Sequence, residues 1–286
     1  MKIALIPINI GHASVEPMIE IAQKAEEVGF ESLWTFEHVV VPLDYESAYP
    51  YNPSGKMGTA PETNFVDPLI ALTAVAASTT KIRLGTGVNI LPQTNPLYLA
   101  KQVASIDFIS NGRMMLGVGI GWLREEFAAL GVPFERRGAR FDDYVVAMRK
   151  VWSGEVVEHE SDFVSWSGFK SYPLPVQKPL PVIIGGSKGK VFQRIARHGD
   201  GWYAPSNSIT GLAAMLPDLE RACAEEGRDV ASVEISAMWI PPMEDVDTVK
   251  RYEDLGVSRL IVPAPALGGT DLAAIERFAD ETLSKL

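Results

Sequence analysis

Short apolar segments alternate along this chain with longer segments in which apolar residues recur at helical spacing. Residues 3–8 (IALIPI) form one continuous apolar run. Apolar positions then recur every three or four residues, at Ile19, Ala22, Ala25 and Val28. A continuous run is typical of a strand buried on both faces, whereas a period near 3.6 indicates an amphipathic helix. The chain therefore opens with a predicted strand and helix.

The same alternation occurs eight times. The predicted strands are residues 3–8, 32–36, 81–88, 113–119, 181–186, 200–204, 233–240 and 259–264, and a helical pattern follows each of them. Strands joined by crossover helices run parallel. Eight such units in 286 residues predict a (β/α)8 TIM barrel. An open doubly wound sheet is the alternative, but the first strand lacks the glycine-rich fingerprint of that fold.

One segment departs from this rhythm. Residues 155–180 alternate like a pair of strands, contain no helical pattern and end in a proline-rich connector. We expect a hairpin inserted after the fourth βα unit, within a single domain that spans residues 1–286.

Composition and charge narrow the class of protein. The net charge is −10 and no lysine or arginine cluster occurs, which argues against nucleic acid and anionic membrane surfaces as partners. Cys223 is the one cysteine, so no disulfide can form within the chain. No apolar run approaches the roughly 18 residues of a membrane-spanning helix. We expect a cytoplasmic protein that acts on a small molecule.

In a barrel of this kind, functional residues lie at the C-terminal ends of the strands. Glu37 and His38 directly follow the second predicted strand. Imidazole serves well as a general acid or base near neutral pH. A loop histidine bonded to backbone is the alternative for His38, and Glu37 either orients a ligand or pairs with a lysine. The residues expected to shape a substrate pocket are His12, Trp34, Trp122, Trp202 and Tyr203.

Glycines mark two further strand ends. Gly185, Gly186 and Ser187 open the helix after the fifth strand, where backbone N–H groups can hold a phosphate, although a plain tight turn is the alternative. Gly117, Gly119 and Gly121 alternate at the end of the fourth strand, where a flat ligand could lie against the backbone. The next segment, residues 124–126 (REE), is interpreted as a solvated helix start.

Two chemistries find no support in the sequence. No set of His, Asp, Glu or Cys residues has the spacing of a metal site, so we expect no metal. No GxSxG motif is present, which argues against a serine hydrolase.

Four long stretches carry a family resemblance: residues 25–38, 81–122, 131–154 and 178–202. In this order they resemble the bacterial luciferase-like flavin family over nearly the full length of the chain. The chain is most similar to the branch that uses the deazaflavin coenzyme F-420. The resemblance implies a (β/α)8 barrel with an insertion after the fourth unit, and a homodimer.

The resemblance also implies roles for the strand-end residues. Glu37 and His38 would face the deazaflavin. A cis peptide bond between Gly87 and Val88, with Asn89 and Ile90 beside it, would support the back of the ring. The turn at residues 185–187 would bind the phosphate of the coenzyme, and residues 117–121 would line the ring.

Two departures from the family pattern matter. FMN-using luciferases carry an arginine for the phosphate in the loop that here reads GVGIG (residues 117–121), and its absence favours F-420. Sugar-phosphate dehydrogenases of the F-420 branch carry a carboxylate where this chain has Trp122, which argues against glucose 6-phosphate. Three functions stay open: an F-420-dependent oxidoreductase, an FMN-dependent monooxygenase that uses reduced flavin and O2, and a non-catalytic cofactor-binding barrel.

Overall fold

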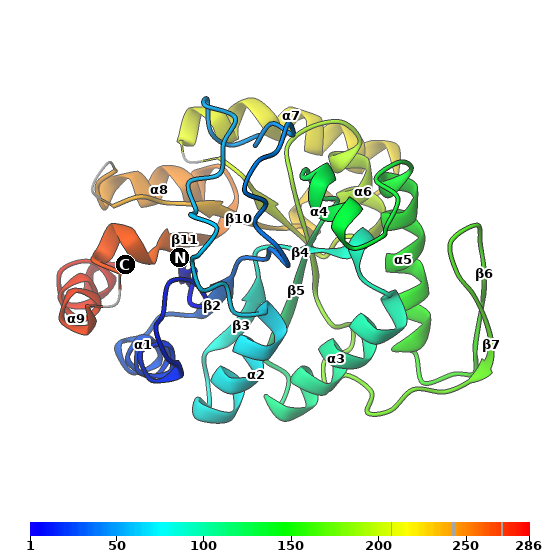
Figure 1. Ribbon diagram of the computed structural model, residues 1–286. Coiled ribbons are helices and arrows are strands. Elements are labelled where there is room, and N and C mark those ends of the chain that lie inside the picture. The colour runs from blue at the N-terminus through cyan, green and yellow to red at the C-terminus, as the bar shows by residue number, and fades with distance from the viewer. Residues whose placement is uncertain (207, 242–243, 270) are drawn as a thin grey trace.

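A computed structural model describes residues 1–206, 208–241, 244–269 and 271–286. Eight parallel strands form a closed barrel (Figure 1). They are β1 (Lys2–Ile6), β2 (Ser32–Thr35), β3 (Arg83–Thr86), β5 (Met114–Gly119), β8 (Val182–Gly185), β9 (Gly201–Ala204), β10 (Glu234–Met238) and β11 (Val257–Pro263). The pairing of β3 with β5 closes the ring, and the short strand β4 (Asn89–Ile90) also pairs with β5. The predicted TIM barrel is confirmed, and each predicted strand overlaps an observed one.

Helices surround the barrel (Figure 1). They are α1 (Val15–Val28), α2 (Pro68–Ser78), α3 (Pro96–Ile109), α4 (Arg124–Ala129), α5 (Arg137–Val151), α6 (Val191–His198), α7 (Ile209–Glu225), α8 (Asp247–Asp254) and α9 (Leu272–Glu281). Asp67 and Asn95 cap α2 and α3, and a proline opens each helix, where its missing N–H is not needed. None of the helices in the described ranges is long and apolar enough to cross a membrane.

The barrel interior is filled by a small cluster around Trp34, whose side chain is completely buried. Its indole N–H donates to Ser32 Oγ at 2.9 Å. A Cβ atom on Gly85 would lie 2.5 Å from the Trp34 ring, so the ring depends on a glycine at that position. A much larger apolar layer packs between the outer face of the strands and the helices.

Arg259 occupies the N-terminal end of the barrel and is fully buried. Its guanidinium donates to both carboxylate oxygens of Glu31 at 2.8 Å, and it also pairs with Glu234. A buried charge is tolerated when carboxylates neutralise it in this way. The ion cluster thus fills the end of the barrel that faces away from the C-terminal ends of the strands.

The inserted hairpin predicted after the fourth βα unit is confirmed. It consists of β6 (Val157–Glu160) and β7 (Ser165–Phe169), which pair antiparallel and project beside α5 (Figure 1). His159 Nε2 lies 2.9 Å from Asp143 Oδ1 of α5, which fixes the hairpin to that helix.

Candidate active site at the barrel mouth

The C-terminal ends of β2, β3 and β5 bring three chain segments to one end of the barrel. Glu37 and His38 follow β2, Gly87 and Val88 follow β3, and Trp122 lies just beyond β5. Their backbones are positioned by parallel strands, whose C-terminal ends all open on the same side. Glu37, His38, Val88 and Trp122 are each partly exposed there, in contrast to the buried strands beneath them.

Glu37 bonds directly to the segment after β3. Its Oε1 accepts the side-chain N–H of Asn89 at 2.9 Å, and its Oε2 accepts the backbone N–H of Ile90. The peptide bond between Gly87 and Val88 is cis, as the family resemblance predicted. Burial raises the pKa of Glu37 to about 8, and the carboxylates of Glu126 and Asp67 nearby add to the rise. At neutral pH the Glu37 carboxyl is therefore mostly protonated.

The raised pKa of Glu37 makes the free energy of unfolding depend on pH, and this dependence can be tested. The folded protein holds a proton on Glu37 that the unfolded chain releases, so this contribution is complete below the ordinary pKa of 4.5 and is lost as the pH rises through about 8. Glu37→Gln stays neutral at every pH. Relative to wild type, we expect its melting temperature to rise by roughly 5 °C between about pH 6 and about pH 9.

Thermal unfolding followed by circular dichroism measures this difference. Glu281→Gln is the control, because Glu281 is an exposed residue at the end of α9. Parallel melting curves for Glu37→Gln and wild type across this pH range would show that Glu37 has an ordinary pKa.

His38 faces a carboxylate that sequence reasoning did not select. Its Nδ1 lies 3.2 Å from Oε2 of Glu126, whose side chain is 2% exposed. Burial by itself would raise the pKa of Glu126, but hydrogen bonds from His38, Gln93 and the Val39 N–H outweigh it and lower the pKa. Glu126 is therefore an anion next to the imidazole.

The interpretation of residues 124–126 as a solvated helix start is wrong for Glu126. The carboxylates of α4 bind the backbone of the long connection between β2 and α2. Glu125 Oε1 accepts the N–H groups of Glu46 at 2.8 Å and Ser47 at 3.2 Å. A sequence signal did exist, since Glu126 lies seven positions after the last residue of β5, at the functional end of the barrel.

Aromatic side chains surround His38. Its ring meets Phe65 edge-on at 5.8 Å and Trp122 at 6.0 Å between ring centres. Trp122 also contacts Tyr45 at 5.7 Å and Tyr49 at 5.1 Å, both from the β2–α2 connection. The predicted place of Trp122 beside the site agrees with this geometry, and the tyrosines are additional members that only the tertiary fold brings there.

Three residues expected in a substrate pocket have packing roles instead. Trp34 fills the barrel interior, and Trp202 is fully buried against Phe192 of α6, with ring centres 5.4 Å apart. His12 is buried, with its Nε2 2.9 Å from the carbonyl of Ile8. Successive residues of a strand face opposite sides, so Trp202 points outward to the helices. Its neighbour Tyr203 points into the barrel and stacks on Trp34 at 5.8 Å.

The strand-end glycines make room for neighbouring chain. A Cβ on Gly117 would lie 1.8 Å from the carbonyl oxygen of Thr86, so this glycine is needed for strand packing and does not face a ligand, contrary to expectation. A Cβ on Gly119 or Gly185 would lie 2.8 Å from a methyl group of Val88. These two glycines therefore let the Val88 side chain lie across the top of the barrel interior.

The turn at residues 185–187 leads into α6, as predicted. The N–H of Gly186 donates to the Tyr203 carbonyl at 3.4 Å. Within the described ranges, the backbone N–H groups of Ser187 and Gly189 donate no hydrogen bond to the protein. They are available to an anion at the start of a helix.

Arg137 of α5 is a cation at this mouth that sequence reasoning missed. Its Nε donates to the carbonyl of Gly121 at 3.2 Å, and its guanidinium lies 3.7 Å over the Phe134 ring. It forms no ion pair with the carboxylates described in the structure. The loop at residues 117–121 has no arginine of its own, but Arg137 of α5 reaches its last residue, Gly121.

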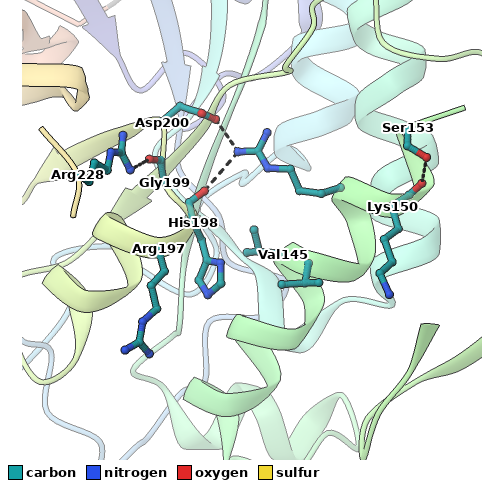
Figure 2. Close-up of a pocket in the computed structure, with 10 residues that line it drawn as sticks. Val145, Lys150, Ser153, Arg197, His198, Gly199, Asp200 and Arg228 are labelled. Carbon is teal, nitrogen blue, oxygen red and sulfur yellow. Dashed lines mark hydrogen bonds and ion pairs between the residues drawn. The ribbon is translucent and has the colours of Figure 1, made fainter. Parts of the chain in front are cut away.

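A cavity of about 570 Å³ lies at the opposite end of the barrel, between α5 and α6 (Figure 2). Its cations already have partners in the protein. Arg149 donates to the carbonyls of Leu180 and His198 and pairs with Asp200 at 2.6 Å, and Arg228 donates to the Gly199 carbonyl at the end of α6. Cations at helix C-termini stabilise the helix dipole. These bonds within the protein explain why basic side chains line the cavity, and no bound ligand is needed to explain them. Among the described residues, no three His, Cys, Asp or Glu side chains are grouped to hold a metal ion.

Comparison with known proteins decides the family. The model of the luciferase-like monooxygenase family matches residues 6–256. The chain belongs to the luciferase-like monooxygenase family. A Mycobacterium tuberculosis protein, itself uncharacterized, is 32% identical over 262 residues, which cover 90% of this chain and 91% of that protein.

Relatives of this luciferase-like protein include F-420 enzymes. An F-420-dependent glucose-6-phosphate dehydrogenase from Amycolatopsis mediterranei is 32% identical over 235 residues, covering 80% of this chain and 62% of that protein. The structure of coenzyme F-420-dependent tetrahydromethanopterin reductase from Methanopyrus kandleri superposes with a TM-score of 0.78 at 17% identity, covering 99% of this chain and 98% of that one. The chain is thus an oxidoreductase of the luciferase-like family, with the fold of its F-420-dependent members.

Proposed function

We propose that this luciferase-like protein transfers hydride between coenzyme F-420 and a small, uncharged organic substrate. One observation carries the proposal. His38, which can exchange a proton, lies next to Glu37 in the chain. Glu37 bonds to Asn89 and Ile90, which follow the cis peptide bond between Gly87 and Val88. A proton-transferring group and a backbone support for a flat ring therefore share one end of the barrel.

The residues at this end fit a deazaflavin. Phe36, Val88 and Met238 pack as an apolar layer over the interior cluster, which suits the face of a flat ring. The unbonded N–H groups of Ser187 and Gly189 and the guanidinium of Arg137 suit an anionic phosphate. An acidic chain can thus attract an anionic cofactor through local donors.

Each residue then has a defined task. When bound, F-420 supplies or accepts the hydride. His38 donates a proton to the substrate oxygen, or removes one from it, through Nε2, because Nδ1 is held by Glu126. Glu37, protonated at neutral pH, secures Asn89 and Ile90 under the ring. Trp122 and the tyrosines packed on it exclude water from this region.

Charge and shape favour an uncharged substrate. The Glu126 carboxylate bonds to His38, and the carboxylates of Glu126 and Asp67 both act on the neighbouring Glu37. Trp122 fills the position next to Gly121 where sugar-phosphate dehydrogenases of the F-420 branch carry a carboxylate. A sugar phosphate would be repelled at this point, so we expect an alcohol, a carbonyl compound or an activated alkene.

A second candidate function is an FMN-dependent monooxygenase, and Arg137 is the observation that favours it. FMN-using luciferases place an arginine at the phosphate, and Arg137 reaches the loop that lacks one. The lack of an arginine within residues 117–121 therefore does not exclude FMN.

Cofactor titration tests the proposal. We expect F-420 to bind at least about tenfold more tightly than FMN or reduced FMN, which corresponds to roughly 1.4 kcal/mol. Fluorescence quenching or calorimetry on the purified protein measures the three affinities. Tight binding of FMN or reduced FMN together with negligible binding of F-420 would instead establish the monooxygenase.

The same titration can locate the phosphate. Arg137→Gln should weaken whichever cofactor binds, because it removes a cation that has no carboxylate partner in the part of the chain that the structure describes. Arg136→Gln is the matched control, since the neighbouring Arg136 is exposed and already pairs with Asp162 at 2.6 Å. Equal losses in both variants would point to a general effect of charge.

A further inference from the structure

Glu126 is a buried carboxylate whose two oxygens bind two different parts of the mouth. Oε1 accepts the backbone N–H of Val39 at 2.6 Å and that of Val40 at 3.3 Å. Oε2 lies 3.2 Å from both His38 Nδ1 and Gln93 Nε2. One side chain on α4 therefore contacts the start of the β2–α2 connection and the imidazole within it.

The chemistry of these contacts fixes the state of the imidazole. A carboxylate anion only accepts hydrogen bonds, so the proton of a neutral His38 must lie on Nδ1. The lone pair is then on Nε2. No hydrogen bond joins Nε2 to the part of the chain described in the structure, so this atom is free to meet a substrate.

We infer that Glu126 is a positioning residue for His38: it selects the tautomer with the proton on Nδ1 and turns Nε2 toward the reacting atoms. Because the same carboxylate binds Val39 and Val40, the imidazole takes this orientation only when the β2–α2 connection lies against α4. The inference rests on the proposed function only for the role of His38 in proton transfer.

Glu126→Gln tests the inference through the tautomer of the His38 imidazole. The Val39 and Val40 N–H groups require an acceptor, so the amide oxygen of Glu126→Gln stays with them. The amide NH2 then faces His38 Nδ1 and donates to it, which forces the proton onto Nε2. An equivalent change at a carboxylate behind a catalytic histidine lowers kcat by about 10⁴-fold through the wrong tautomer.

Glu125→Gln is the matched control. Glu125 lies in the same turn of α4 and binds the same connection, through the N–H groups of Glu46 and Ser47, without touching His38. The amide oxygen of Glu125→Gln can still accept these two N–H groups, so the variant removes a carboxylate from α4 while the imidazole keeps Glu126 as its partner. Glu126→Asp is a second variant, which keeps an anion near Nδ1.

The measurement is 15N NMR of the histidine side chains in the full-length protein above about pH 8, where an imidazole is neutral. The chain has four histidines, so loss of one signal in His38→Ala assigns His38. We expect the Nδ1–H tautomer in wild type, Glu125→Gln and Glu126→Asp, and the Nε2–H tautomer in Glu126→Gln. A parallel loss of kcat on the order of 10²-fold or more, with cofactor affinity unchanged, is expected for Glu126→Gln alone.

The outcomes separate this inference from the proposed function. An unchanged tautomer in a folded Glu126→Gln overturns the inference. Equal changes in Glu126→Gln and Glu125→Gln also overturn it, because they would show a general effect of removing a carboxylate from α4. Where Glu126→Gln does not fold, an Nε2–H tautomer in wild type or Glu126→Asp overturns it. A tautomer change in Glu126→Gln alone supports the inference, even if neither F-420 nor FMN binds and the proposed function fails.

Discussion

Replacing His38 with alanine is expected to abolish most turnover while leaving cofactor binding nearly intact. A positioned general acid or base contributes about 10²- to 10⁴-fold to a rate, and kcat should fall within this range. The His38 ring packs edge-on against Phe65 and Trp122 and bonds to Glu126, whereas the proposed phosphate and ring contacts come from other residues. Cofactor affinity should therefore change by less than about fivefold, or about 1 kcal/mol.

Two measurements establish this result. Cofactor affinity is measured by titration, and hydride transfer is followed by cofactor absorbance with a panel of alcohols and carbonyl compounds. His198→Ala is the control, because His198 ends α6 beside the cavity at the opposite end of the barrel (Figure 2). Turnover of His38→Ala at the wild-type rate would remove His38 from the reaction. Loss of cofactor binding would instead assign it to the cofactor site.

The second large effect is expected at Gly117. A Cβ atom there would lie 1.8 Å from the carbonyl oxygen of Thr86. The Cβ is fixed to the backbone of β5, and the oxygen is part of the backbone of the adjacent strand β3. Backbone cannot move aside as a side chain can, so β3 and β5 must separate. We expect Gly117→Ala to lower the free energy of unfolding by about 4 kcal/mol or more, or to prevent folding. Thr86 leads into Gly87 and Val88, so any folded Gly117→Ala should also bind cofactor more weakly.

Graded controls make the Gly117 result interpretable. Gly119→Ala meets a methyl group of Val88 at 2.8 Å, which a side chain can relieve, so a smaller loss of about 1–3 kcal/mol is expected. Gly58→Ala meets nothing within 4 Å and should stay within about 0.5 kcal/mol of wild type. Denaturant unfolding compares the three variants. Equal stability of Gly117→Ala and Gly58→Ala would contradict the close approach of β3 and β5.

Some site residues could be predicted because a residue that comes just after a strand of a parallel barrel lies at the barrel mouth. Glu37 and His38 come two and three residues after the end of β2, and a residue at that position of a parallel barrel lies at its mouth. Glu126 and Arg137 could not be chosen in this way. Their roles depend on contacts with His38, 88 residues away, and with the Gly121 carbonyl, 16 residues away. Such contacts depend on how a long loop and two helices fold over the barrel. The position of Glu126 soon after β5 places it near the mouth, but it does not indicate that His38 is its partner.

The aromatic residues show the same limit. The sequence predicts both Trp202 and Tyr203 as pocket residues, because both lie toward the C-terminal end of the sixth predicted strand. Which of the two faces the interior depends on strand register, and a shift of one residue exchanges them. The closed barrel turns Tyr203 inward and Trp202 toward α6.

The sequence by itself determined the eight strands, the inserted hairpin, the family and the position of the cis peptide bond. The strands and the hairpin follow from local periodicity, whereas the family and the cis peptide bond follow from the resemblance of four continuous stretches to that family. Only the tertiary structure decided that Gly117 is a packing residue, that Trp34 fills the interior, and that a buried carboxylate holds His38. The physical reason is that packing, burial and tautomer selection are set by groups distant in sequence, which meet only when the barrel closes and the β2–α2 connection folds across its mouth.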